Sequence, residues 1–144
     1  MKVFAYINPE LNILCCALLK EAVPSGINAI EFDVDKPDDV IYDGTKIRLK
    51  TQNEQLQELK QKYLDQLKKY VNGLFSSTDY IVVKISEAIV NEDNEEVSNL
   101  KQQYAIQLQQ RKAIRDWNNK IKEEINNASN VEQLNTIVIQ YQGI

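Results

Sequence analysis

Apolar side chains recur at intervals of three and four residues through most of the chain beyond Thr51. They form two stripes, which are separated by the apolar segment from Leu74 to Asp93. The first stripe contains Leu56, Leu59, Tyr63, Leu67, Tyr70 and Leu74, and the second contains Val97, Leu100, Tyr104, Leu108, Ile114, Trp117, Ile121, Ile125 and Ala128. This spacing places apolar side chains on one face of an α-helix. It predicts helices over about 52–73 and 95–127, each of which needs a partner for its apolar face.

Local signals mark where these helices begin and end. Thr51 and Glu54 fit a capping box, in which the two residues satisfy each other's backbone N–H groups. Gly73 is placed to help end the first helix. After the second, Ser129 or Asn130 can cap a short helix over about 131–138, and the β-branched residues from Val138 leave an extended tail open as the alternative.

The segment between the stripes, "LFSSTDYIVVKISEAIVNED", is apolar nearly all round. Its β-branched content is compatible with a strand, but its length and its Ser-Thr-Asp opening favour a helix over about 78–91. A helix of this kind must be covered on more than one face. We therefore expect a three-helix arrangement with both flanking helices, and a partner subunit over any face that remains.

Residues 1–50 have strand character instead. Short apolar or alternating runs are separated by turn signals, and all three prolines fall in this part of the chain. The run "VIYDGTKIRLK" predicts a hairpin, because Asp43-Gly44 supplies the positive φ values of a tight turn. The predicted fold is therefore α+β, with a small antiparallel β unit over 1–50 and a helical bundle or long helical hairpin over 51–144.

Composition limits the classes of function that this chain can have. A net charge of −4 offers no basic patch for nucleic acid, and no apolar run approaches the length of a membrane helix. The N-terminus lacks the pattern of a secretion signal, so a cytoplasmic location is expected.

The chain has no histidine, so Ser77, Thr78 and Asp79 are interpreted as a helix start and not as a hydrolase site. Adjacent Cys15 and Cys16 cannot readily pair with each other, and one is expected in the core and one near the surface.

Two groups of charged residues are candidate ligand sites. The acidic run from Glu31 to Asp43 has enough oxygens for calcium, but its spacing fits no EF-hand loop, and a solvated strand edge is preferred. Arg111 and Arg115 share a helix face and invite phosphate, but no glycine-rich loop accompanies them. Pairing of one arginine with Asp79, Glu87 or Asp116 is the preferred interpretation. We therefore predict no catalytic residue, no cofactor and no metal.

Protein contacts remain as the expected mode of action. The stripe on the long second helix extends beyond what the short apolar helix can cover, so an apolar patch is expected to project from it. The expected result is a homo-oligomer. The candidate interaction residues are Leu56, Leu59, Tyr63, Arg111, Arg115, Trp117 and Ile121.

The chain also resembles a known class of proteins. The segments "SSTDYIVVKISEA", "YA-x5-R-x3-RDW" and "A-x-x-V-E-Q-L" look like small proteins encoded among the tail and tail-fibre genes of tailed bacteriophages and prophages. The resemblance spans nearly the whole chain. It implies a non-enzymatic tail-associated structural protein or tail-fibre assembly factor, which oligomerises and grips other tail proteins.

A protein of that class would act in the host cytoplasm during phage assembly. Incorporation into the virion tail is the other location that the resemblance allows. The alternative is a small host regulatory or ligand-binding module, whose acidic N-terminal unit binds a cation or a peptide. Tail genes on either side of this gene would favour the first reading.

Overall fold

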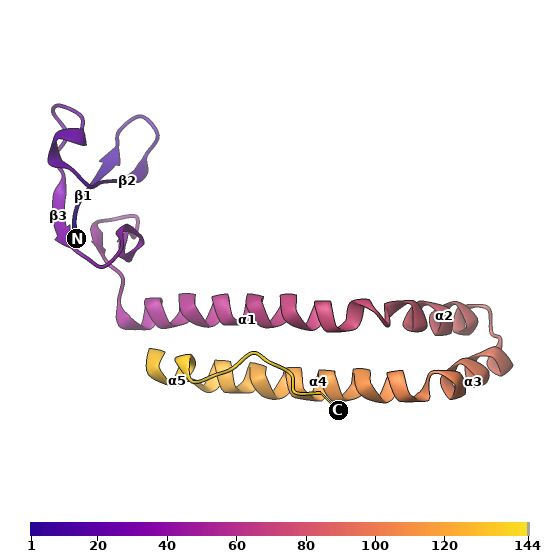
Figure 1. The fold of residues 1–144 in the computed structure, drawn as a ribbon. Coiled ribbons are helices and arrows are strands. Elements are labelled where there is room, and N and C mark those ends of the chain that lie inside the picture. Colours follow the sequence, from indigo (N-terminus) through magenta and orange to yellow (C-terminus); the bar gives the residue numbers. More distant parts are fainter. Residues whose placement is uncertain (144) are drawn as a thin grey trace. The chain divides into compact units, whose positions relative to one another are not determined.

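The structure, a computed structural model, describes residues 1–143 and has the expected α+β architecture (Figure 1). Antiparallel strands come first in the chain, and helices follow. The chain divides into two compact units, of which the first is Met1–Gln57 and the second begins at Glu58. The second unit begins inside the first long helix, seven residues beyond the predicted start at Thr51.

The first unit contains a three-stranded antiparallel sheet. Strand β1 (Lys2–Asn8) lies between β2 (Ile13–Ala17) and β3 (Ile30–Asp33), so β2 and β3 are the two edges. Two short 3-10 helices, η1 (Lys20–Ala22) and η2 (Pro37–Asp39), follow β2 and β3 in the chain. Alternation along β1 places the fully buried side chains of Val3 and Ala5 on one face of the sheet.

The predicted hairpin is present, as β4 (Val40–Tyr42) and β5 (Ile47–Leu49). Of the two turn residues, Gly44 alone has a positive φ, of 90°. Asp43 instead accepts the N–H groups of Thr45 and Lys46 on its carboxylate, both at 3.0 Å, which fixes the turn. A core cluster joins the hairpin to the sheet and consists of Val3, Ala5, Val34 and Val40, with Leu14, Phe32 and Ile47 packed against it.

Helix α1 (Gln52–Ser76) begins with the predicted capping box. The Thr51 hydroxyl accepts the Glu54 N–H at 3.2 Å, and the Glu54 carboxylate accepts the Thr51 N–H at 2.8 Å. The predicted end at Gly73 is wrong, because Gly73 has no left-handed conformation and lies inside the helix. The helix ends three residues later, where the Ser76 hydroxyl donates to the Gly73 carbonyl.

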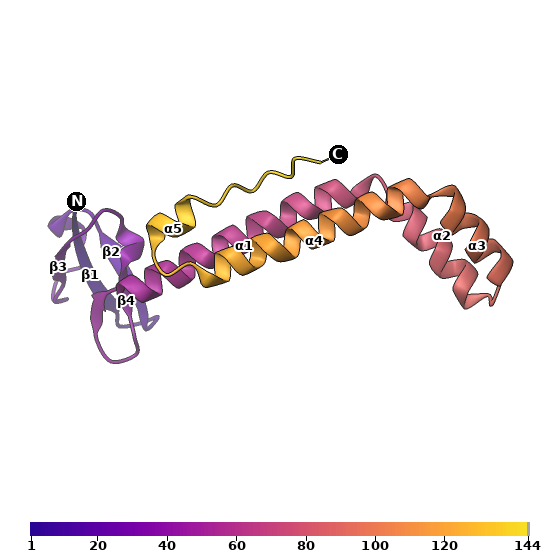
Figure 2. The same cartoon turned by 90° about the horizontal axis from the view of Figure 1, so that it is seen from below.

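Four further helices complete the second unit: α2 (Asp79–Val90), α3 (Asn94–Gln103), α4 (Ala105–Asn127) and α5 (Val131–Asn135). Figures 1 and 2 show a helical hairpin, in which α4 lies beside α1 and α3 lies beside α2. The chain reverses between α2 and α3, where Glu92 has a φ of 56° and Asp93 caps α3 by accepting the Glu96 N–H. The short α5 begins at the predicted cap Asn130, whose side chain accepts the Gln133 N–H.

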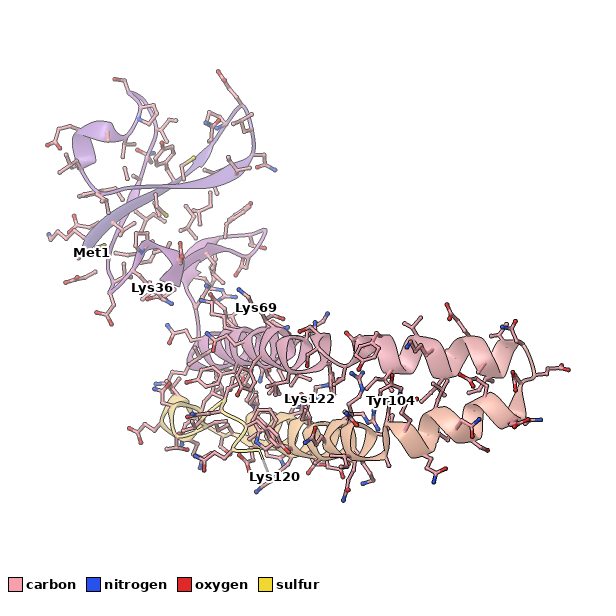
Figure 3. All side chains as sticks on the ribbon, turned by 45° about the vertical axis from the view of Figure 1, so that its right-hand side comes forward. Met1, Lys36, Lys69, Tyr104, Lys120 and Lys122 are labelled. Carbon is pink, nitrogen blue, oxygen red and sulfur yellow. The ribbon has the colours of Figure 1, made fainter. Side chains whose placement is uncertain are left out.

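The predicted helix over 95–127 is divided in the structure. Its stripe is continuous, but α3 ends at Gln103 and α4 begins at Ala105, with Tyr104 between them (Figure 3). The backbone of Tyr104 is not α-helical, with a φ of −106° and a ψ of 22°. Helix α5 is also shorter than predicted and ends at Asn135, because Thr136, Ile137 and Val138 are β-branched and disfavour a helix.

The helical hairpin therefore has two parts, which we call the shaft and the tip. The shaft comprises α1, α4 and α5, and its fully buried side chains include Leu67, Ile125 and Leu134. The tip comprises α2 and α3 and buries Ile81, Ile85, Ala88 and Leu100 in a cluster of its own. None of the helices in residues 1–143 is long and apolar enough to cross a membrane.

Candidate protein-interaction surface

Most of the apolar interaction candidates are occupied inside the protein. Leu56 and Ile121 are buried, and Leu59 and Tyr63 are half-buried on α1. The Tyr63 hydroxyl donates to the side-chain oxygen of Asn135, the last residue of α5, at 3.2 Å. These residues stabilise the shaft in the described structure.

Trp117 does not project from α4 as expected. Its ring packs against Tyr70 of α1, with the ring centroids 5.9 Å apart, and against Tyr141 of the C-terminal segment, at 5.4 Å. The Tyr141 N–H donates to the Tyr70 hydroxyl, which holds that segment against α1. The expectation of an exposed patch at Trp117 and Ile121 is therefore wrong, because the sequence pattern did not show where the tail would lie.

Arg111 and Arg115 have different environments. Arg111 is 8% exposed, and its guanidinium donates to the Phe75 carbonyl at 3.1 Å and to the Thr78 hydroxyl at 2.7 Å. It also forms an ion pair with Asp79 at 3.0 Å, one of the predicted partners. Arg115 is exposed on the same helix. The two arginines therefore do not converge on one anion.

This arrangement also changes the interpretation of the Ser-Thr-Asp opening. Thr78 occupies the N-cap position of α2, but its side chain does not accept a helix N–H. Its hydroxyl donates to the Phe75 carbonyl and accepts from Arg111. The Arg111 guanidinium also lies over the Phe75 ring, 4.4 Å from its centroid. Arg111 thus ties α4 to the junction between α1 and α2.

Several exposed apolar side chains lie on α2, where the sequence predicted burial. Helix α3 packs along this helix, and Leu108 of α4 packs against the same cluster, whereas α1 and α2 follow one another on the same arm of the hairpin (Figure 1). The three-helix arrangement is therefore wrong, and one face of α2 faces solvent. Its large exposed side chains are Tyr80, Val82, Val83, Ile89 and Val90, with Val83 54% and Val90 80% exposed.

This outer face of α2 contains an open hollow of about 340 Å³. Three valines line it together with Ser86, Glu87 and Asn91: Val82, Val83 and Val90. The Ser86 hydroxyl donates to the Val82 carbonyl at 2.7 Å, so it needs no other partner when the face is covered. The hollow therefore presents mainly apolar surface with a satisfied hydroxyl at its centre.

A second hollow, of about 400 Å³, belongs to the first unit and is lined by Asp33, Asp35 and Asp39 among others. Asp33 pairs with the N-terminal amine at 3.2 Å, and Lys36 lies 3.7 Å from the Asp39 carboxylate. Within residues 1–143, no group of three or more cysteine, aspartate or glutamate side chains is arranged to hold a metal ion.

The strongest pKa shifts lie in an exposed cluster around Arg48. Its guanidinium donates to Asp43 at 2.8 Å and, through both terminal nitrogens, to Glu54 at 2.8 and 2.9 Å. Hydrogen bonds from Arg48 and then from the backbone lower the pKa of Asp43 and of Glu54 to about 2. The cluster joins the hairpin turn to the first turn of α1, so its role is structural.

No family model, curated protein or solved structure matches this chain. Sequence reasoning missed the outer face of α2, because no residue in the short connection between α1 and α2 indicates whether the chain reverses there.

Proposed function

We propose that this chain is a non-enzymatic protein-binding component of a tailed bacteriophage, either a tail-associated structural protein or a tail-fibre assembly factor. The observation that carries the proposal is the outer face of α2, which leaves Val82, Val83 and Val90 exposed around one hollow. Covering apolar surface releases about 25 cal/mol per Å². A contiguous apolar patch on an otherwise charged helix surface is typical of a protein-binding site.

The chemistry of this face fits the docking of a side chain better than it fits bond making. Its centre is a serine whose hydroxyl already donates to the helix backbone, and a chain without histidine offers that serine no imidazole base. The segment "SSTDYIVVKISEA", on which the resemblance to phage tail proteins depends, includes most of α2. The exposed face of α2 and the resemblance of its sequence therefore both favour α2 as the binding helix.

Co-purification with the products of neighbouring genes tests the proposal. The tagged chain would be co-expressed with each tail protein encoded beside it, as wild type and as Val83→Glu. Val83 is exposed, so the charge leaves the fold intact and places a carboxylate in the hollow. Ile106→Glu is the matched control, because Ile106 is an exposed apolar residue of α4 outside the hollow.

We expect a tail protein to be retained by the wild type and by Ile106→Glu, and to be lost with Val83→Glu. Two results would overturn the proposal. One is retention of the tail protein by folded Val83→Glu at the wild-type level. The other is that the wild type retains none of the neighbouring tail proteins.

A further inference from the structure

Strand β2 is an open edge of the sheet in the first unit, and the direction of its backbone groups follows from the register. At the start of β1, the Met1 amine donates to the Val34 carbonyl at 2.6 Å, and the Val34 N–H donates to the Met1 carbonyl at 2.9 Å. Hydrogen-bonded pairs alternate along an antiparallel ladder. The odd-numbered residues of β1 therefore bond to β3, and the even-numbered residues bond to β2.

The same alternation fixes which groups of β2 face solvent. Tyr6 is opposite Cys15, so the backbone groups of Cys15 point toward β1. The N–H and C=O groups of its neighbours, Leu14 and Cys16, must then point outward from the sheet. No hydrogen bond to another segment of residues 1–143 satisfies these four groups.

The two edges of the sheet differ in charge. Strand β3 carries Glu31 and Asp33, and acidic side chains on an edge discourage pairing with another copy of the same strand. Strand β2, with the sequence ILCCA, has no charged residue and no proline. Exposed leucines flank it, since Leu11 and Leu19 are each 66% exposed. An edge of this kind is open to pairing with an added strand.

We propose that β2 pairs antiparallel with β2 of a second copy of this chain, about a two-fold axis at Cys15. In this register Leu14 faces Cys16 of the second copy as a hydrogen-bonded pair, and Cys16 faces Leu14 of that copy. All four outward groups of each strand are then satisfied. The register also aligns all five residues of β2, and it places Ile13 opposite Ala17 of the second copy.

A second copy fits this edge for two reasons. The strand is neutral, so its pairing with itself brings no like charges together, in contrast to β3. Exposed leucines flank the strand at both ends. When the two copies run antiparallel, Leu11 of one copy lies at the same end of the paired strands as Leu19 of the other. The contact is small beside a standard interface of about 1,600 Å², so the dimer is expected to form at roughly micromolar or higher concentration.

Disulfide cross-linking tests the register. Opposed residues of a non-hydrogen-bonded pair have Cα atoms about 4.5 Å apart, within the range of roughly 4.4–6.8 Å that a disulfide spans. Diamide would take two electrons and two protons from the two Cys15 thiols as they form the bond. Burial raises the pKa of the Cys16 thiol above its ordinary value, so the oxidation is run at about pH 10, where its ionisation limits the rate less.

The two single-cysteine variants are matched controls for each other. We expect Cys16→Ser to form covalent dimers through Cys15, and Cys15→Ser to form them at least about tenfold more slowly. Random collision predicts the opposite order, because Cys16 is the more exposed thiol. Equal rates, faster cross-linking of Cys15→Ser, or no cross-linking of either variant would overturn the proposed register.

Sedimentation of the full chain tests the edge without oxidation. Cys16→Pro removes an outward N–H that has no partner within one copy, so it should leave the fold intact and weaken dimerisation at least about tenfold. Cys15→Lys is a second variant, which places two like charges opposite each other and should weaken the dimer similarly. Cys16→Ser should dimerise as the wild type does.

A monomeric wild type at millimolar concentration would overturn the inference. So would a dimer that both Cys16→Pro and Cys15→Lys leave unchanged. Val83→Glu separates this inference from the proposed function: it should retain the β2 dimer while it loses the tail protein. A dimer lost in Val83→Glu and kept in Cys16→Pro would place self-association on α2 instead.

Discussion

At the scale of single residues, Arg48 and Arg111 show how a cation can organise a junction. Arg48 holds the hairpin turn to the start of α1, and Arg111 holds α4 to the end of α1. Each guanidinium reaches two or more acceptors, which its planar fork allows and a lysine ammonium would do less well. Both junctions are places where the chain changes from one element to the next.

The Arg48 cluster makes stability sensitive to acid. The folded-state pKa values of Asp43 and Glu54 are about 2, below the ordinary values of 3.8 and 4.5. Each carboxylate therefore contributes stability that is fully present above its ordinary pKa and is lost as the pH falls toward about 2. We expect the melting temperature of Glu54→Gln to lie below that of the wild type at pH 6, and the difference to shrink between about pH 4.5 and 2.

Thermal unfolding at several pH values, followed by circular dichroism, measures this. Asp65→Asn is a suitable comparison, since Asp65 is also on α1 and accepts a hydrogen bond from Gln61. If the two melting temperatures of wild type and Glu54→Gln stayed equally far apart from pH 6 to pH 2, the pKa shifts would not be the cause of the difference.

The sequence predicted the short-range parts of these junctions and missed the long-range ones. The capping box of Thr51 and Glu54 is readable, because its partners lie three residues apart in a fixed geometry. The pairing of Arg111 with Asp79 was one of several predicted choices. That Thr78 would bind Arg111 and not cap its own helix depends on residues 33 apart, which no local pattern contains.

At the scale of elements, α2 shows why an all-round apolar helix need not be buried all round. Its inward side chains Ile81, Ile85 and Ala88 pack in the tip cluster, while its outer face remains in water. The strand character of residues 1–50 and the hairpin were predictable from alternation and from Gly44, since both signals are local. The partner of α2 was not predictable, because it depends on the path of the chain beyond Ser76.

Two substitutions in α2 separate its inner face from its outer face. Ile85→Asp places an unpaired charge in the tip cluster and should lower the free energy of unfolding by several kcal/mol, of the order of 3 or more. Val83→Asp, two residues earlier, should change it by less than about 0.5 kcal/mol. Urea unfolding of both variants beside the wild type provides the measurement.

A large loss of stability with Val83→Asp would show that its side chain is covered, contrary to the exposure of that face. An Ile85→Asp variant that unfolds at the wild-type urea concentration would show that the tip cluster contributes little to stability.

At the scale of the whole molecule, the two units have different chemistry. The first contains the acidic hollow and the open β2 edge, and the second contains the outer face of α2. Each unit can be altered by substitutions that leave the other unchanged, so their functions are separable by experiment.

The reading of the first unit as a cation-binding module is tested by melting temperature. We expect neither calcium nor magnesium to raise it, because two of the acidic side chains around the hollow, Asp33 and Asp39, already pair with the N-terminus and Lys36. A cation at a hundred times its dissociation constant would add about 2.7 kcal/mol to the free energy of unfolding. An upward shift with either ion, reversed by a chelator, would restore the cation-binding alternative.

Both arms of the helical hairpin are interrupted, one after Ser76, where Arg111 of α4 contacts the junction, and the other at Tyr104. The backbone amides of the tip therefore form a set that can exchange with deuterium without opening the shaft. Their protection reports the free energy of opening the tip alone, and Arg111, which spans the interruption, contributes to that energy. A partner held on the outer face of α2 would slow exchange throughout α2 and α3, including at amides it does not touch, and would leave exchange in the shaft unchanged.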